Sequence, residues 1–510
     1  MLQLKSMPEN KKLIAKNTLY LYVRMLLVMC VALYTSRVIL SSLGATDYGI
    51  YNVVGGIVIM FSFLSGSLSG ATSRYMSYDL GRNDFAQLRK TFSASLNIYI
   101  ATAILIMILG EILGLWLLCN KLTIPSDRMN AAHWVLQFTI ITAFFNFTQY
   151  PYTASLIAHE NMSVYAYAGI YEAVSRLIIA LAIMISPIDH LIFYALLLMI
   201  NQIGVLLFYR YYAFRKYEEC RFQLIKDKDL YKKLLSYSGY DMLPSMGFIV
   251  QEQGINIMLN VFFGPVVNAA KAISTQVNGA LNQFVINILQ AARPQVIMQY
   301  AQGNTKEMYS LTFLVAKFSY LLMLAMIMPL WVEMDYVINL WLGDVAPPKS
   351  SLFCKIVLLN VMVNALSSSI AMSMHAIGKL RYYSIINSIL FLLPLPIGYV
   401  FFRFGLPDYS ILLLSVIFNI LIAVNVLIQL YHLKKYNLSY VFKDICIVCT
   451  VITILTYMVL SLEHIYLTEG FLRLVAVVLT SSIMISCYSW LYVLSNSQRK
   501  HIKTLILNKL

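Results

Sequence analysis

The sequence predicts an all-α polytopic membrane protein with about fourteen transmembrane helices. Three observations lead to this fold class. The 510 residues are 60% hydrophobic and only 12% charged, about half the charged share of a typical soluble domain. Apolar runs of about 20 residues, the length that crosses the hydrocarbon core, recur along the whole chain. The connections between these runs are short, so neither side of the membrane has room for a catalytic domain.

The first apolar run is too long for the core of a signal peptide and lacks a convincing cleavage site, so we expect a retained helix. Gly264 and Pro265 separate the seventh run from the eighth. Taken in order, the apolar runs predict spans at 17–40, 49–72, 92–118, 132–157, 164–186, 190–212, 237–262, 267–292, 309–332, 350–373, 383–402, 410–430, 444–462 and 471–494.

Basic residues predict the orientation of these spans. The outer connections 186–190 and 463–470 contain no lysine or arginine. Because cytoplasmic connections carry the excess of basic residues, both termini are expected in the cytoplasm. The net charge of +15 then reflects topology and gives no reason to expect a nucleic-acid partner. Basic residues are concentrated at 74–90, 210–233, 378–382, 434–435 and 498–503.

A weak internal repeat divides the chain. LGATDYGIYNVV (43–54) follows the first span, and FGPVVNAAKAIS (263–274) follows the seventh. Six spans separate the two, so both copies cross the membrane in the same direction, a parallel repeat known among transporters. We therefore expect two six-helix lobes and two additional helices, although chance similarity of glycine-rich helices is an alternative. The predicted parts are 1–236, 237–442 and 443–510.

The eighth span carries the most polar side chains. On a helix, Lys271, Thr275, Asn278 and Asn282 fall on one face together with Asn268. A buried cation needs water or an anion, so this face is expected to line a wet cavity, with bonding to neighbouring helices as the alternative. A second polar stripe, about 120° away, comprises Gln276, Gln283, Asn287 and Gln290.

Acidic residues in the seventh span are candidates for ion coupling. Glu252 is expected either to pair with Lys271 or to bind a coupling proton or sodium ion, and Asp241 lies near the inner end of the same span. In the fifth span, Glu172 and Arg176 are spaced i,i+4, and we interpret them as a structural pair.

The sequence lacks the common motifs of nucleotide-binding proteins and hydrolases. No nucleotide-binding, zinc-hydrolase or serine-hydrolase motif occurs, so ATP use, a metal and enzymatic activity are not expected. Cys446 and Cys449 lack a second pair or a histidine partner and are interpreted as packing residues. No cofactor is expected apart from a coupling ion.

Two stretches carry a resemblance to a known family. TSRVILSSLGATDYGIYNVVGGIVIMFSFLSGSLSGATSRYMSYDLGRND (35–84) and QEQGINIMLNVFFGPVVNAAKAISTQVNGALNQFVINILQAARPQVIMQYAQGN (251–304) resemble bacterial polysaccharide flippases of the multidrug/oligosaccharidyl-lipid/polysaccharide exporter superfamily. The similarity is greatest to the O-antigen, Wzx-like branch and extends over nearly the whole chain in span number and topology.

This resemblance implies a function and a set of site residues. It implies two lobes around a central cavity that opens alternately to each side. It also implies a place in the bacterial inner membrane and transport of undecaprenyl-pyrophosphate-linked oligosaccharide from its inner to its outer leaflet, presumed to be driven by an ion gradient. Contact with polysaccharide polymerase machinery is a further expectation. Cations of the first helix and of the C-terminal lobe are thought to hold the diphosphate in such flippases, and the matching positions are Arg24 and Lys271, with Arg37 as a further candidate.

Two other functions are alternatives to the flippase. A multidrug efflux transporter shares the fold but uses membrane-embedded acids to bind cations. The first span has two arginines and no acid, which favours an anionic substrate, while Glu252 and Asp241 keep efflux as the alternative. An O-antigen polymerase would need a sizeable outer loop, and no connection is long enough.

The two arginines of the first span do not share a helix face. Thirteen residues of α-helix separate Arg24 from Arg37 by about 140° around the axis and about 20 Å along it. Arg37 lies about one turn from the predicted outer boundary, where it can extend to the interface or act at an outer gate. Arg24 is deeper and is the preferred diphosphate ligand.

Overall fold

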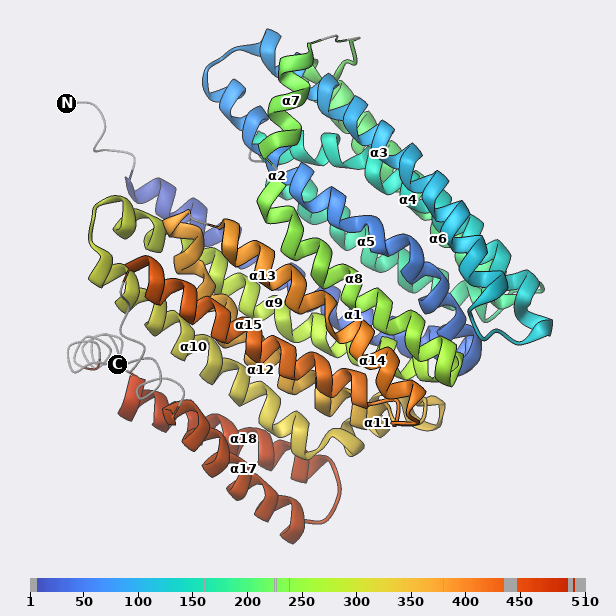
Figure 1. Ribbon diagram of the computed structural model, residues 1–510, viewed down its shortest axis with the longest axis vertical. Coiled ribbons are helices and arrows are strands. Elements are labelled where there is room, and N and C mark those ends of the chain that lie inside the picture. Colours follow the sequence, from blue (N-terminus) through green and yellow to red (C-terminus); the bar gives the residue numbers. More distant parts are fainter. Residues whose placement is uncertain are drawn as a thin grey trace. The chain divides into compact units, whose positions relative to one another are not determined.

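The structure is a computed structural model, and it describes residues 7–159, 161–223, 225, 227–237, 239–378, 380–434, 447–493 and 499 (Figure 1). The described residues form helices and short connections, and they contain no β-strand. The predicted all-α class is therefore confirmed. Two compact units divide the chain, Met1–Ala269 and Ala270–Leu510. They divide it at a different residue from the predicted lobes, whose boundaries stay a prediction.

The first unit packs its helices around apolar side chains. Its core includes Phe92, Leu156 and Tyr209, contributed by α3, α4 and α6 and almost fully buried. α8 packs against α1 and α2. The helices are α1 (Met7–Ile59), α2 (Phe63–Gly81), α3 (Phe85–Asn120), α4 (Met129–Ala158), α5 (Met162–Ile183), α6 (His190–Lys216), α7 (Lys228–Tyr237) and α8 (Gly239–Phe263), followed by the first turn of α9 (Pro265–Ala301).

The second unit contains the rest of α9 and the helices that follow it. α10 packs against α12, α17 and α18, and α12 packs against α15. Buried Phe313, Met374 and Leu430 fill the space between α10, α12 and α15. The helices are α10 (Thr305–Val332), α11 (Met334–Leu342), α12 (Ser350–Ile377), α13 (Arg381–Leu392), α14 (Pro394–Arg403), α15 (Ser410–Lys434), α17 (Val448–Tyr466) and α18 (Phe471–Tyr488).

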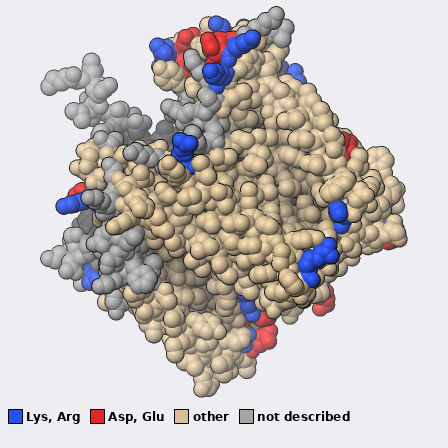
Figure 2. Space-filling view, viewed as in Figure 1, with Lys and Arg blue, Asp and Glu red and all other residues tan. Residues whose placement is uncertain are grey.

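Each predicted span overlaps one or two of these helices. By length and composition, nine helical segments of the described residues are able to cross a membrane. The total of fourteen spans stays a prediction, and so does the orientation of the termini. In the space-filling view, charged side chains lie mainly near helix ends, and the surface along the helices is almost free of them (Figure 2). This distribution is the one that a lipid environment requires.

Some predicted span boundaries differ from the helices. The first two spans join in α1, where only Gly44 leaves the helical conformation (φ 74°, ψ 168°). A left-handed φ is accessible to glycine without steric cost, so the chain changes direction there without a separate loop. The predicted span 383–402 is divided between α13 and α14 at Pro394, which lacks the amide hydrogen needed to continue a helix.

Ion pairs join the connections at one end of the first unit. The Arg128 guanidinium donates to Asp47, with Nε to Oδ1 at 2.8 Å, and to Asp189, with Nη1 to Oδ2 at 2.6 Å. These residues come from three connections that the sequence assigns to one side of the membrane. Partial burial raises the pKa of Asp189, but hydrogen bonds from Arg128 and from two backbone amides lower it below its usual value overall.

The long connection between α6 and α8 is held to the other end of the first unit. Glu219 is buried and its Oε1 lies 2.5 Å from His159 Nε2. Arg89 Nε donates to the carbonyl oxygen of Arg221 at 3.0 Å. The amphipathic α7 then packs Leu230 and Leu234 against Ala94 of α3. These contacts hold the polar connection against the helices of the first unit.

A buried ion pair anchors the C-terminal helices in the second unit. Glu333, between α10 and α11, is 1% exposed, and its Oε2 accepts from Arg473 Nη2 of α18 at 2.7 Å. His464 of α17 contacts the other carboxylate oxygen at 2.9 Å. One carboxylate therefore joins α10, α17 and α18 at a single point.

Candidate functional site

The start of α9 is fixed by a very close approach to α1. Gly264 has a φ of +84°, and Pro265 then begins α9, a position where proline's fixed φ suits the helix. A Cβ on Gly49 of α1 would lie 1.8 Å from the carbonyl oxygen of Pro265. Only glycine at position 49 allows these two backbones to meet. The sequence showed Gly49 as one of several glycines, and its partner is visible only in the structure.

Hydrogen bonds between amides continue this contact. Asn268 Nδ2 of α9 lies 2.6 Å from both the carbonyl and the side-chain oxygen of Asn256 in α8. Asn256 Nδ2 in turn donates to the carbonyl oxygen of Asn52 in α1 at 3.0 Å. Asn268 is completely buried. The structure therefore gives Asn268 an interhelical role, the alternative considered for the polar face of α9.

Lys271 lies three residues after Asn268 on α9 and belongs to the second unit. Its side chain is 95% buried, and Nζ donates to Thr275 Oγ1 at 3.2 Å, one turn further along α9. Thr275 is itself exposed. The buried ammonium group of Lys271 therefore lies beside an exposed hydroxyl, next to a surface that a polar ligand is able to reach.

Amide side chains extend the polar face beyond Thr275. Asn282 donates to the side-chain oxygen of Asn278 on the same helix. Asn364 Nδ2 of α12 donates to Asn282 Oδ1 at 3.0 Å. Asn278 and Asn282 are half-buried, and Asn364 is exposed. The structure thus brings together the four predicted residues of α9 as one polar face of the second unit and adds Asn364, which the sequence did not single out.

The remaining predicted site residues are Arg24, Arg37, Asp241 and Glu252. The side chains of Arg24 and Asp241 lie outside the described residues, although both belong to helices. Arg37 is exposed and precedes the break of α1 at Gly44. Glu252 is half-buried on α8 in the first unit. The predicted pairing of Glu252 with Lys271 and the roles of these residues stay predictions.

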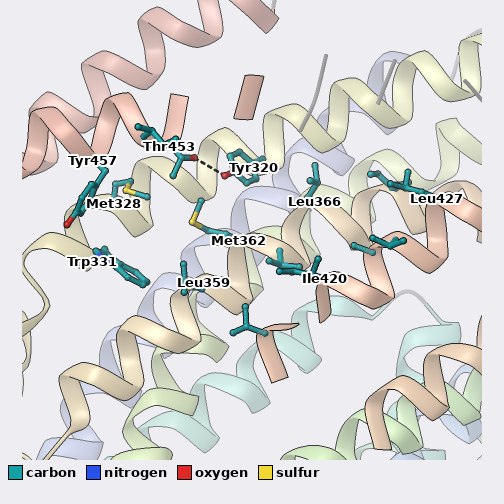
Figure 3. Close-up of a pocket in the computed structure, with 16 residues that line it drawn as sticks. Tyr320, Met328, Trp331, Leu359, Met362, Leu366, Ile420, Leu427, Thr453 and Tyr457 are labelled. Atoms are coloured by element: carbon teal, nitrogen blue, oxygen red, sulfur yellow. Dashed lines mark hydrogen bonds between the residues drawn. The ribbon is translucent and has the colours of Figure 1, made fainter. Parts of the chain in front are cut away.

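An apolar cavity of about 740 Å³ lies in the second unit between α10, α12, α15 and α17 (Figure 3). Its walls are aliphatic and aromatic, with Trp331, Leu366 and Ile420 among them. Its polar groups are few, and the Tyr320 and Thr453 hydroxyls satisfy each other at 2.8 Å. Such a lining suits a hydrocarbon chain and offers nothing to a charged ligand.

A smaller cavity of about 240 Å³ in the first unit is polar. Glu172 and Arg176 of α5 line it, together with side chains of α2, α4 and α6. Their i,i+4 spacing in the sequence predicts a structural pair. In the sequence, only two opposite charges in an apolar helix indicate this cavity. Its other walls come from distant segments, so the cavity is visible only in the folded unit.

Comparisons with known proteins agree with this architecture. Residues 21–182 match the sequence model of the MatE family. The chain is similar to the inward-facing structure of a multidrug resistance MATE family transporter of the MOP superfamily, with a TM-score of 0.66 and 15% identity over 82% of this chain and 99% of that one. The chain has the MATE transporter fold.

Two further structures extend the comparison of this MATE-fold chain. The inward closed conformation of the lipid II flippase MurJ has a TM-score of 0.66 and 13% identity, over 93% of this chain and 98% of that one. The outward-facing MATE transporter has a TM-score of 0.60 and 14% identity, over 82% and 97%. The search of curated proteins found no match. The predicted O-antigen branch stays a prediction at this point.

Proposed function

We propose that this MATE-fold protein is a flippase for undecaprenyl-pyrophosphate-linked oligosaccharide, which it moves from the inner to the outer leaflet by alternating access. The observation that carries the proposal is the polar face of α9. It combines the buried ammonium group of Lys271 with the hydroxyl of Thr275 and with the linked amides of Asn278, Asn282 and Asn364.

The chemistry of this face fits the head of such a lipid. A diphosphate is strongly hydrated and does not cross hydrocarbon unaided, so a transporter must replace its water with fixed donors. An ammonium group supplies charge-assisted hydrogen bonds to phosphate oxygens. Amide side chains both donate and accept, as sugar hydroxyls do. Arg24 is proposed as a second diphosphate ligand because arginine offers two parallel donors.

The apolar cavity supports the same substrate class. A polyprenyl tail presents only hydrocarbon, and the cavity between α10, α12, α15 and α17 offers an apolar surface of about 740 Å³. α17 forms one of its walls, with Thr453 and Tyr457. The lipid II flippase structure also matches a larger share of this chain, 93%, than either MATE transporter, 82%.

Cation-coupled multidrug efflux is the second candidate. Glu252 favours it because a half-buried carboxylate in a membrane helix is a binding group for a proton, a sodium ion or a cationic drug. The similar inward-facing and outward-facing MATE structures are of a multidrug resistance transporter. In the flippase proposal Glu252 and Asp241 instead bind the coupling ion.

Complementation of a deletion strain tests the two functions. We expect the deletion strain to lose surface glycan and to accumulate lipid-linked glycan in the inner leaflet, and we expect the wild-type gene to restore export. Normal surface glycan with increased sensitivity to cationic dyes would overturn the flippase and favour efflux.

A matched pair of variants tests the part played by α9. Lys271→Met keeps the length of the side chain but removes the charge next to Thr275, so we expect it to reduce surface glycan at least tenfold. Lys317→Met removes a half-buried lysine from α10 and serves as the control, with export near the wild-type level. Membrane levels of both variants are measured by immunoblot. Equal export by the two variants would remove Lys271 from the site.

A further inference from the structure

The polar cavity of the first unit is assembled from four helices. α2 contributes Ser69, α4 contributes Asn146, Gln149, Tyr150 and Thr153, α5 contributes Glu172 and Arg176, and α6 contributes Gln202 and Tyr209. Asn146 and Arg176 are exposed, so the cavity opens at the surface of the chain. Its deeper wall is closed by Tyr209 and Thr153, which are 2% and 8% exposed.

The lining carries donors and acceptors in balanced numbers. Gln202 Nε2 donates to Gln149 Oε1 at 2.8 Å, which links α6 to α4 across the cavity. An amide group has two donor hydrogens and two acceptor lone pairs, and this bond uses only one of each.

The charges of the cavity exclude a strongly charged ligand. Glu172 and Arg176 lie one turn apart on the same face of α5 and carry opposite charges, so their sum is zero. A site for a phosphate group would need an excess of cations, and a site for a drug cation would need an excess of acids. A balanced charge therefore favours a neutral ligand, and hydroxyl groups, which both donate and accept, match the amide and hydroxyl side chains of the lining.

The size of the cavity sets a limit on that ligand. Its volume of about 240 Å³ equals that of about eight liquid waters at roughly 30 Å³ each. Pockets for drug-sized molecules occupy about 300–1,000 Å³. One sugar ring therefore fits, whereas an oligosaccharide does not. Tyr150 and Tyr209 add aromatic surface, which suits the apolar C–H faces of such a ring.

We propose that this cavity binds a single neutral sugar residue of the transported glycan through the amides of Gln149 and Gln202. This inference rests on the proposed flippase function, and it adds a carbohydrate subsite in the first unit to the polar face of α9 in the second. The cavity then selects among glycans by the arrangement of hydroxyl groups on one ring.

The test compares two lipids on the full-length protein in nanodiscs. One probe is undecaprenyl pyrophosphate, and the other is the same lipid carrying one N-acetylglucosamine. We expect the wild-type protein to bind the sugar-bearing lipid roughly three- to tenfold more tightly, the gain that about one net hydrogen bond provides.

A double variant isolates the amides. Gln149→Leu/Gln202→Leu removes both partners of one hydrogen bond, so neither amide is left buried and unpaired. The control is Asn387→Leu/Asn425→Leu, which removes a buried amide pair between α13 and α15, where Asn425 Nδ2 donates to Asn387 Oδ1 at 2.8 Å. We expect the first double variant to bind both lipids equally and the control to keep the preference for the sugar.

The outcomes separate the subsite from the flippase function. A preference that persists in Gln149→Leu/Gln202→Leu would overturn the subsite and leave the flippase function standing. Failure of the wild-type protein to bind either lipid would overturn both. If the amide variant keeps the sugar preference while Glu172→Gln changes the sodium or proton dependence of lipid binding, the cavity is an ion site and the proposal is wrong.

Discussion

Substitution of Gly49 by alanine tests the contact that positions α9. The added Cβ would lie 1.8 Å from the Pro265 carbonyl oxygen and 2.6 Å from its carbonyl carbon. Ordinary contact begins at 3.4 Å, so the shortfall at the oxygen is 3.4 − 1.8 = 1.6 Å. Both atoms belong directly to the backbone, so no change of rotamer relieves the overlap. α1 and the first turn of α9 must move apart.

The cost follows from two contributions. Overpacking of a close contact destabilises by about 1–3 kcal/mol. The same displacement stretches the Asn268–Asn256 hydrogen bonds, which are 2.6 Å long, beyond bonding distance, and an unsatisfied buried amide costs a further 1–3 kcal/mol, roughly. We therefore expect Gly49→Ala to lower the free energy of unfolding by about 2–6 kcal/mol.

Two glycines on the same helix provide matched controls. A Cβ on Gly55 would meet only Thr139 Cγ2, at 4.0 Å, so Gly55→Ala is expected to be neutral or to stabilise α1 by up to about 1 kcal/mol. A Cβ on Gly56 would lie 2.4 Å from Gln253 Oε1, the mobile end of a side chain, so Gly56→Ala should fall between the two.

Thermal unfolding of the full-length protein in detergent, followed by tryptophan fluorescence, measures these differences. The expected order of melting temperature is Gly55→Ala highest, Gly56→Ala intermediate and Gly49→Ala lowest. If Gly49→Ala melts at the same temperature as Gly55→Ala, the close approach of α1 to Pro265 does not exist, and the positioning of α9 derived from it is wrong.

Three further predictions concern a buried charge, the apolar cavity and the first helix. Arg473→Met leaves Glu333 buried without its guanidinium partner and should lower the free energy of unfolding by about 3–5 kcal/mol. Lys355→Met removes an ion pair with Asp335, which is 76% exposed, and should lower it by less than about 1 kcal/mol. Ala423→Trp fills part of the apolar cavity and should reduce surface glycan about tenfold, an effect of about 1.4 kcal/mol, at unchanged membrane level of the protein. Arg24→Ala should abolish surface glycan while the protein remains in the membrane.

Each of these predictions has an outcome that contradicts it. Equal melting temperatures for Arg473→Met and Lys355→Met would show that burial of the first pair has no energetic consequence. Val451→Trp places the same indole side chain at an exposed position of α17, so a loss of export equal to that of Ala423→Trp would assign the effect to the indole and not to filling of the cavity. Full export by Arg24→Ala would remove Arg24 from the diphosphate site.

Periodicity and span length were sufficient for the fold class because lipid imposes one rule on every residue. Each apolar run long enough to cross the membrane must pair its backbone internally, and a helix does this locally. The exact helix limits depended on single residues instead. Gly44 put a kink between the first two spans without a separate loop, and Pro394 divided another span, because backbone conformation at these positions decides whether a helix continues.

The candidate site was predictable only in part. The helical period placed Lys271, Thr275, Asn278 and Asn282 on one face, and in the structure they form two hydrogen-bonded pairs, Lys271 with Thr275 and Asn282 with Asn278. The same period included Asn268, which the structure assigns to contact with α8, because its partner Asn256 lies across the Gly264 turn. Angular position on one helix does not specify which neighbour the helix meets.

The sequence by itself determined that this chain is helical and built for a membrane, and it indicated which helix carries the polar face. Only the tertiary structure decided what those helices enclose. The polar cavity needs Ser69, Gln149, Glu172 and Gln202 from four helices, and the contact of Gly49 with Pro265 joins residues far apart in the chain. Composition and helical period describe one segment at a time. Cavities and close backbone contacts form where distant segments pack, so no single helix specifies the space between helices.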